Sequence, residues 1–323
     1  MTYKLYPALA LCVLAGCGGG GTTTAPWDGE TGSGQEQPAP DGLIPDDLPR
    51  PGTKPAPAPD RFQNFSTVPA DGTYTLHGTG ISANLSKDGA GKVIVSTAGA
   101  AQPATFVLTN AAGKVVANSL SANGATASFD LRAGDTALLQ DTLIIARSKD
   151  GATYVVQDKT AGGTYDYQSY GAWMTGARTD AGVKGAASVG ARTLASAMPT
   201  QPSEHAAQGH FNGVASGLMT SNAGVPSAIS SKIYVQTDFN SLTLESYDTI
   251  LTVPETGAIS ATPGLNFKGT GSVSGTTFSV PLDGDILHGS ASGAFYGPKA
   301  EELGGTFQTS GSGYDYIGAF GAN

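Results

Sequence analysis

Cysteine is nearly absent from this sequence. Its two cysteines, Cys12 and Cys17, both lie at the N-terminal end. The rest of the chain has none, so the folded part must rest on its hydrophobic core and on hydrogen-bonded strands without a disulfide. The same shortage leaves no cysteine to join a histidine in a structural zinc site. We therefore expect neither a disulfide framework nor a zinc site.

Charge is also scarce. Charged residues make up 13% of the chain, about half the usual share, whereas glycine contributes 46 residues. This composition suits short strands and tight turns, and no window shows a long apolar run at helical spacing. The net charge of −9 would repel a phosphate backbone. The sequence thus predicts an all-β protein that does not bind nucleic acid.

Motifs of catalysis are missing as well. The serine-hydrolase motif Gly-x-Ser-x-Gly does not occur, and Ala291 stands at the centre of a near match. Paired carboxylates occur at Asp46-Asp47 and Glu301-Glu302, and we interpret both pairs as solvated charges. Without Gly-x-Gly-x-x-Gly ahead of a helix, a nucleotide site lacks its scaffold. We predict that the protein is not an enzyme, and an envelope hydrolase is the least favoured function.

The N-terminus has the features of a leader for export. Lys4 precedes an apolar stretch at residues 5–14, which is too short to span a bilayer as a permanent helix. The stretch ends in Leu-Ala-Gly-Cys, which resembles the lipobox of bacterial lipoproteins. The resemblance implies that residues 1–16 are a signal peptide and that Cys17 is acylated, which would anchor the protein in the outer membrane.

Composition divides the rest of the chain into three parts. Residues 17–60 are rich in Gly and Pro, and we expect an extended, flexible tether there. In residues 61–164, short alternating segments are separated by turn dipeptides, which predicts a β-rich handle domain. In residues 165–323, eight or nine segments of strand character predict an up-and-down antiparallel barrel. The turn dipeptides are Asp71-Gly72, Asp88-Gly89, Asn123-Gly124 and Asp150-Gly151.

One stretch, residues 289–307, resembles the signature of the transferrin-binding protein B-like β-barrel domain of Gram-negative surface lipoproteins. Three further segments at 170–173, 209–217 and 235–239 resemble strands of the same barrel, and the first of these resembles its opening strand. The resemblance implies that Phe295 and Phe307 point into the barrel, and we expect one helical turn from Lys299 to Leu303. The implied fold class is all-β, with an N-terminal handle followed by an eight-stranded antiparallel β-barrel.

The resemblance also implies a function. Members of this family bind transferrin, haem, haemoglobin or complement regulators, or serve host colonisation, and many reach the surface through an outer-membrane translocon. The chain has a single handle and a single barrel, whereas transferrin-binding protein B is bilobed, which favours the smaller single-lobe relatives. We therefore predict a surface lipoprotein that captures an iron- or haem-related molecule or protein, and a TonB-dependent receptor is a further partner to be expected for uptake. The alternative is a structural or colonisation lipoprotein without a small ligand.

Candidate binding residues are few. No cofactor is expected, but if haem is a ligand, His77 in the handle or His205 in the loop before a strand would be its axial ligand. The aromatic residues around Tyr170 alternate along one segment, so half of them should be core and the other half could form an exposed recognition patch. These aromatic residues are Tyr165, Tyr167, Tyr170 and Trp173.

Overall fold

The computed structural model describes residues 71–111, 114–159, 165–177, 181–199, 209–221 and 226–323. The predicted leader, the acylated Cys17, the tether and His205 lie outside these ranges. The described elements are β-strands joined by turns and a few short 3-10 helices, as the composition predicts. Within the described ranges, no helix is long and apolar enough to cross a membrane.

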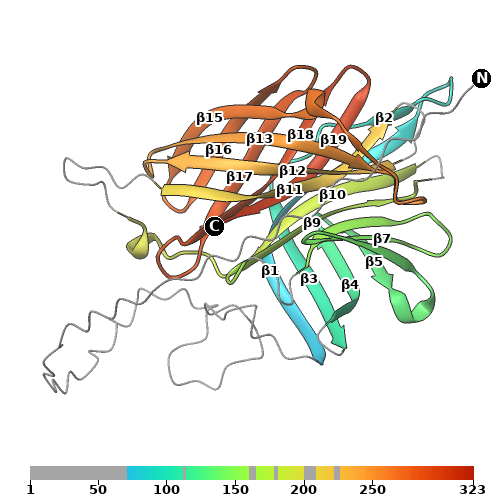
Figure 1. The fold of residues 1–323 in the computed structure, drawn as a ribbon, viewed down its shortest axis with the longest axis horizontal. Helices are drawn as coiled ribbons and strands as arrows, with labels where there is room; N and C mark the ends of the chain where they lie inside the picture. The colour runs from blue at the N-terminus through green and yellow to red at the C-terminus, as the bar shows by residue number, and fades with distance from the viewer. Residues whose placement is uncertain (1–70, 112–113, 160–164, 178–180, 200–208, 222–225) are drawn as a thin grey trace, which may run out of the picture. The chain divides into compact units, whose positions relative to one another are not determined.

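The first ten strands form one antiparallel sheet, the handle sheet (blue to yellow-green in Figure 1). Its strand order is β5-β4-β3-β1-β10-β9-β8-β7-β6, and β2 pairs with the end of β1. Tight turns join neighbouring strands, as at Asn123-Gly124, where both residues are left-handed (φ 51° and 75°), as an Asn-Gly hairpin requires. The strands are β1 Gly72–Lys87, β2 Val93–Val95, β3 Gln102–Ala111, β4 Lys114–Ala122, β5 Ala125–Asp130, β6 Thr136–Gln140, β7 Leu143–Arg147, β8 Tyr154–Asp158, β9 Gln168–Thr175 and β10 Ala181–Gly190.

Eight later strands close into an antiparallel barrel (yellow to red in Figure 1). They follow the order β12-β11-β19-β18-β17-β16-β15-β13, and the β12–β13 pairing closes the ring. The fold class predicted from the sequence is thus confirmed. The strands are β11 Gly209–Ser221, β12 Pro226–Thr237, β13 Ser241–Thr252, β15 Phe267–Ser274, β16 Thr277–Gly284, β17 His288–Tyr296, β18 Glu302–Gly311 and β19 Tyr314–Ala322, and the short β14 Ile259–Ala261 pairs with β13.

Side chains fill the barrel, as an eight-stranded barrel requires. Phe295 and Phe307, which the family resemblance places inside, are both buried in the barrel core. The ring of Phe307 lies 5.0 Å from that of Phe267 and 4.8 Å from that of Tyr316, measured between centroids. Offset and edge-on aromatic pairs of this kind add to the stability that burial provides.

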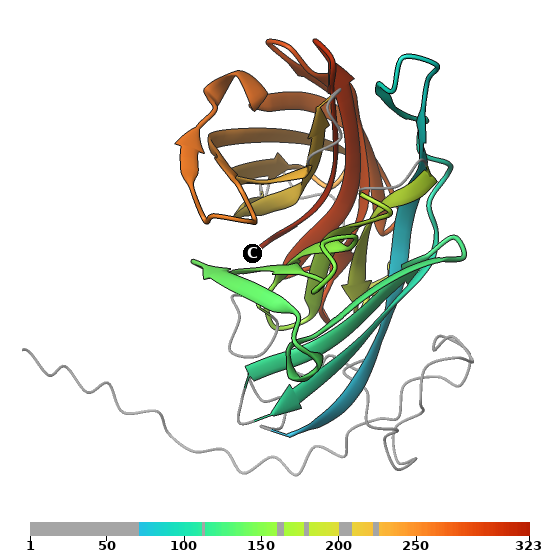
Figure 2. The same ribbon diagram turned by 90° about the vertical axis from the view of Figure 1, so that its right-hand side faces the viewer.

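The handle sheet packs against the outer face of the barrel. One buried apolar cluster contains Tyr170 and Met174 from β9 together with Leu218 and Ile317 from the barrel wall. Figure 2 shows the yellow-green handle strands beside the red barrel strands. The other face of the handle sheet has its own core, built around Phe106, Trp173 and other apolar residues. Strand β9 is therefore buried on both faces.

The structure corrects the assignment of β9 and β10. The alternating aromatic residues around Tyr170 predicted the first strand of the barrel, but β9 pairs with β8 and β10, and β10 pairs with β1. Both strands therefore belong to the handle sheet, and the barrel reaches eight strands without them. Alternation shows that a strand has buried side chains, but it does not show which sheet the strand joins.

The signature stretch is also partly corrected. β17 ends at Tyr296 and Gly297 turns the chain with φ 88°, as expected. The predicted helical turn from Lys299 to Leu303 does not form, because Ala300 adopts a left-handed conformation (φ 62°) and β18 already begins at Glu302. The chain thus returns to the sheet through a tight turn.

Candidate binding surface

An arm, residues 88–101, connects β1 to β3 and folds back on the far end of β1 (teal, beside β2 in Figure 1). Its sharp turn forms because the Asp88 carboxylate accepts hydrogen bonds of 2.9 Å from the backbone N–H groups of Ala90 and Lys92. An aspartate whose carboxylate accepts hydrogen bonds from the backbone N–H groups of the next few residues favours such turns. Strand β2 then pairs with residues 85–87 of β1. The arm is therefore ordered by its own local hydrogen bonds.

Gln308 on β18 fixes the arm to the barrel wall. Its side-chain oxygen accepts a hydrogen bond of 2.6 Å from the N–H of Ala98, and its Nε2 donates to the carbonyl of Ser96 at 3.1 Å. Nε2 also donates to the Asp315 carboxylate at 3.3 Å. A single amide side chain thus joins the arm to two adjacent barrel strands, β18 and β19.

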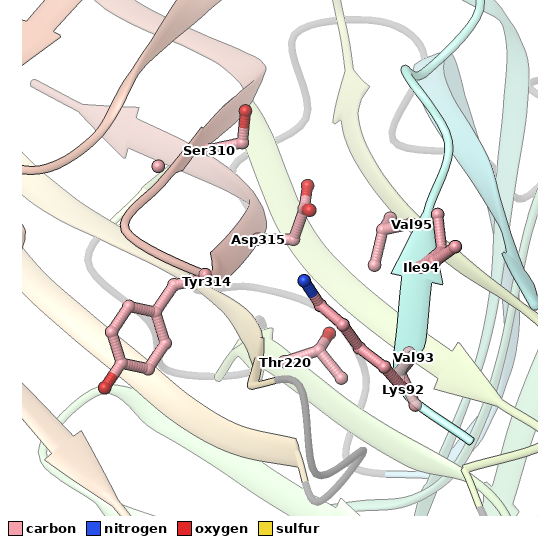
Figure 3. Close-up of a pocket in the computed structure, with 10 residues that line it drawn as sticks. Lys92, Val93, Ile94, Val95, Thr220, Ser310, Tyr314 and Asp315 are labelled. Atoms are coloured by element: carbon pink, nitrogen blue, oxygen red, sulfur yellow. The ribbon is translucent and has the colours of Figure 1, made fainter. Parts of the chain in front are cut away.

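We call Gln308 and its hydrogen bonds to the arm the clamp. A first cavity of about 240 Å³ opens on one side of it. It lies between the arm, the end of β11 and the β18–β19 turn. The Lys92 side chain reaches across it toward Asp315 (Figure 3). Ile94 and Tyr314, which are two of the large apolar side chains exposed among the described residues (46% and 36%), also line it. The cavity therefore combines an aliphatic, an aromatic and two charged groups at the surface.

A fully buried lysine lies beside the residues of the first cavity. Lys184 on β10 donates hydrogen bonds to the Thr220 hydroxyl (2.6 Å) and to the Asp315 carbonyl (2.7 Å). Burial disfavours the charged form and lowers the pKa of Lys184 to about 7, although Asp315 opposes this effect. Burial also raises the pKa of the Asp315 carboxyl. The lysine joins the handle sheet to the barrel immediately behind the cavity wall.

A second cavity of about 380 Å³ opens on the other side of the clamp. It is lined by the end of the arm, by Ile81 and by small residues of β17. His288 lies at its rim, with Nδ1 held 2.5 Å from the Asp283 carboxylate. Its lining is mainly backbone and small side chains, so its shape is set by the strands themselves.

Glu302 is where a sequence interpretation fails. The pair Glu301-Glu302 was expected to be solvated, but only Glu301 is exposed, while Glu302 is buried. The Glu302 carboxylate accepts hydrogen bonds from the N–H groups of Asp166 (2.5 Å) and Tyr167 (3.1 Å), just before β9. Burial raises the pKa of Glu302 to about 7. Its position fixes the start of β9 to the barrel, which is a structural role.

The other predicted residues fall into two groups. His77 lies exposed on β1, away from both cavities, while Cys17 and His205 lie outside the described residues. Tyr170 and Trp173 are buried in two different cores, so they do not belong to an exposed recognition patch. Where the structure is described, no three His, Cys, Asp or Glu side chains gather closely enough to hold a metal ion.

Sequence reasoning missed the residues that build the binding surface. The strand character of Lys92 to Ser96 was recognised, but nothing local shows that this strand leaves the sheet and meets the barrel. Gln308 and Tyr314 lie in ordinary alternating segments. Their one available signal is the turn between β18 and β19, because turns at the ends of barrel strands often carry function.

Several solved structures match this chain. One is a variant of transferrin binding protein B from Actinobacillus pleuropneumoniae, with 12% identity, a TM-score of 0.41, and 76% of this chain and 100% of that chain covered. Another is isotype 1 transferrin binding protein B from Neisseria meningitidis, with 15% identity and a TM-score of 0.38. The match covers 76% of this chain and 43% of that chain. A third is HpuA from Kingella denitrificans in complex with human haemoglobin, with 13% identity and a TM-score of 0.37. The match covers 80% of this chain and 88% of that chain.

A comparison with curated proteins gave no match. The family of C-lobe and N-lobe beta barrels of Tf-binding protein B matches residues 160–323. The matched region contains all eight barrel strands and also β9 and β10. Since the match spans half of the chain, the protein belongs to the family of transferrin-binding protein B β-barrels.

Proposed function

We propose that this chain is a lipid-anchored surface protein that captures a protein ligand, with the arm and the β18–β19 turn as its contact surface. The observation that carries the proposal is the pair of exposed apolar side chains, Ile94 and Tyr314, at the rim of the first cavity. Lys92 and Asp315 lie between them (Figure 3). An aromatic and an aliphatic anchor with charges nearby resembles the centre of a protein–protein interface.

The clamp at Gln308 supports the same proposal. Its two hydrogen bonds to the arm hold Ile94 near the barrel before any ligand arrives. A surface that is already ordered loses little conformational entropy on binding, so more of the contact energy appears as affinity. At about 240 Å³, the first cavity is smaller than the roughly 300–1,000 Å³ of typical small-molecule pockets, which favours a side chain of a protein ligand as the group bound there.

The place of action in this proposal follows from the N-terminus. The lipobox-like segment ending at Cys17 would attach the protein to the outer membrane, and residues 17–60 would hold the folded part away from it. Export across that membrane would require the surface lipoprotein translocon of this family. A TonB-dependent receptor would accept the cargo if the ligand carries iron or haem.

The ligand class that we propose is an iron-related protein. The similar solved proteins include transferrin binding protein B and a haemoglobin complex, so transferrin and haemoglobin are the first probes. Haem itself is the second candidate, with His77 or His205 as its axial ligand. A structural or colonisation lipoprotein without a small ligand is the alternative, and it would show no binding to any of these probes.

Biosensor experiments test the protein-ligand proposal. The full mature chain is immobilised, and human transferrin and haemoglobin are passed over it. We expect binding of at least one, with a tenfold or greater loss in Ile94→Ser and Tyr314→Ser. Ile259→Ser serves as the control, because Ile259 is also an exposed apolar residue but lies on β14. Absence of binding to both proteins, or equal loss in the control, would overturn the proposal.

The haem version needs a separate measurement. Haem is added to the purified chain, and the Soret band is followed in the wild type, in His77→Ala and in His205→Ala. A shifted band that disappears in one variant would assign the axial ligand. An unchanged spectrum in the wild type would exclude haem as the ligand.

A further inference from the structure

Strand β6 lies at a free edge of the handle sheet. It is the last strand in the sheet order, so within the described residues its outer side pairs with no other strand. All of its residues except Gln140 are exposed, and Leu139 leaves 64% of its surface in solvent. Exposed edge strands are templates for pairing with another chain, and proteins usually protect them with charges or prolines.

Both faces of this edge are apolar. Leu138 lies opposite Ile145, which belongs to the cluster between the handle sheet and the barrel. Leu139 lies opposite Ile144, which belongs to the core on the other face. Opposite residues on antiparallel strands share a face, so each core continues to the edge and ends there in an exposed leucine. A strand with two apolar faces is typical of a sheet interior.

The edge is held firmly in place. The Gln140 side chain accepts a hydrogen bond of 2.7 Å from Thr252 on β13. A Cβ placed on Gly257 would lie 3.6 Å from the Leu138 side chain, so the β13–β14 connection contacts β6 from the barrel side. Ile259, exposed at 60%, lies two residues further on. The two sheets thus present apolar side chains beside one fixed strand.

Acidic residues stand at both ends of β6. Asp135 precedes it and Asp141 follows it. Asp141 is exposed, whereas Asp135 is half-buried and its carboxylate accepts hydrogen bonds of 2.9 Å from the backbone N–H groups of Asp130 and Lys149. Two of the cations near the strand have acidic partners. Arg147 lies opposite Thr136, and its guanidinium group is 3.9 Å from the Glu255 carboxylate. The pKa of Lys232 is raised in part by the charge of Asp141, and its ammonium group is 2.8 Å from the Asp248 carboxylate. The two flanking carboxylates therefore favour positive charge on whatever pairs with the strand.

The flanks also oppose self-pairing. If two copies paired antiparallel through β6 about its centre, Asp135 of one would lie opposite Asp141 of the other at both ends. Like charges opposite each other destabilise a strand pair, so a second copy of this chain is a poor occupant. An extended segment with Lys or Arg at both ends would turn the same contacts into attraction, which the net charge of −9 would assist at long range.

We propose that β6 accepts an extended segment of another protein as an additional antiparallel strand, apolar in its middle and basic at both ends. Backbone hydrogen bonds along the edge would supply affinity, and the two leucines would select the apolar centre. This surface is distinct from the arm and its cavities, so the proposal goes beyond the ligand capture described above and does not depend on it.

Two seven-residue peptides test this proposal on the full mature chain. The first is Lys-Thr-Val-Tyr-Val-Thr-Lys and the second replaces both lysines with glutamate. Fluorescence anisotropy at low salt should show at least tenfold tighter binding of the basic peptide, with an affinity that falls as salt is added. Amide hydrogen exchange should slow at residues 136–140 when the peptide is present.

Variants identify the surface. Leu139→Asp, at an exposed position, should lower the affinity for the basic peptide at least tenfold. Asp141→Asn should reduce the ratio of the affinities for the basic and the acidic peptide. Ile94→Ser, on the arm, should change neither. Equal binding of both peptides, unchanged exchange at 136–140, or full binding to Leu139→Asp would overturn the proposal. So would a dimer in sedimentation velocity that Leu139→Asp dissociates, because it would assign the edge to a second copy.

Discussion

The side-chain oxygen of Gln308 on β18 accepts a hydrogen bond of 2.6 Å from the backbone N–H of Ala98, which lies 210 residues earlier in the arm. This contact converts a surface loop into one wall of two cavities. Because Val93, Val95 and Ala98 of the arm also pack against the cluster between the handle sheet and the barrel, Gln308 should control the mobility of the arm more than its fold.

Replacing Gln308 with alanine should therefore loosen the arm. The variant loses the hydrogen bonds to Ala98 and Ser96, which together contribute about 1–3 kcal/mol. We expect faster amide exchange in residues 92–101, little change in the barrel strands, and a modest loss of stability. Gln308→Glu is the matched variant, since it keeps the acceptor for Ala98 but loses both donors. Its second carboxylate oxygen would also face the Ser96 carbonyl and the Asp315 carboxylate, so exchange in the arm should be at least as fast as in Gln308→Ala. Unchanged exchange in both variants would contradict the role assigned here.

Glu302 predicts a pH dependence of stability. Burial raises its pKa from 4.5 to about 7 in the folded state, so folding takes up a proton between these values. Its contribution is fully present below about pH 4.5 and is lost as pH rises to 7, a change of about 3 kcal/mol. Urea unfolding between pH 4.5 and 7 should therefore show a smaller fall in Glu302→Gln than in the wild type.

Two comparisons isolate this effect. Asp158, whose pKa burial raises to about 8, adds a fall in every variant; since the Glu302 carboxylate also contributes to that shift, this fall should be smaller in Glu302→Gln as well. Glu301→Gln, at the exposed neighbouring position, should follow the wild type. If Glu302→Gln also retains the full slope, the carboxyl of Glu302 titrates normally in the folded protein.

The elements that the sequence predicts well are those determined locally. Turn dipeptides such as Asn123-Gly124 indicate the hairpins, and the alternation of apolar and polar residues indicates the strands. Together they predict the all-β class and the segments that form the eight barrel strands. The signature also placed Phe295 and Phe307 correctly in the core. These features depend on residues that are close in the sequence, and a single sequence contains that information.

What failed depends on contacts between distant segments. β9 and β10 have the pattern of barrel strands, but β9 pairs with β8, just before it, and β10 pairs with β1, far earlier in the chain. Lys184 stands in a strand of small residues where a lysine indicates a solvent face. It is buried because the wall of a second sheet covers it, and its hydrogen-bond acceptors, Thr220 and Asp315, come from that wall. Strand patterns alone do not specify which sheet covers which.

Lys184 gives a second pH prediction of opposite sign. Burial lowers its pKa from 10.5 to about 7, so folding releases a proton at intermediate pH. Stability from this group is therefore present above about pH 10 and is lost as pH falls toward 7, which amounts to about 2–3 kcal/mol between pH 9 and 7. Lys184→Met should remove this dependence in urea unfolding, whereas Lys268→Met, at an exposed position, should keep it. Equal slopes in all three proteins would show that Lys184 stays charged.

Gly304 tests the packing of the signature stretch against the handle sheet. A Cβ at this position would collide with the side-chain oxygen of Gln168 and lie 2.9 Å from the carbonyl of Phe320. Gln168 cannot easily move, because its Nε2 donates to the Leu303 carbonyl at 2.6 Å in a buried site. Gly304→Ala should therefore destabilise the protein by about 1–3 kcal/mol, as overpacking of a filled core does.

The matched control for this prediction is Gly264→Ala. A Cβ at Gly264 would meet nothing within 4 Å, so this substitution should change stability by no more than about 0.5 kcal/mol. Both variants are compared by urea unfolding with tryptophan fluorescence, because Trp173 lies in the handle core. A double variant that adds Gln168→Ala should recover part of the loss, since the smaller side chain makes room for the new methyl group. No recovery, or equal stability of the two single variants, would mean that the close contact between Gly304 and Gln168 of β9 does not limit the packing of the barrel against the handle sheet.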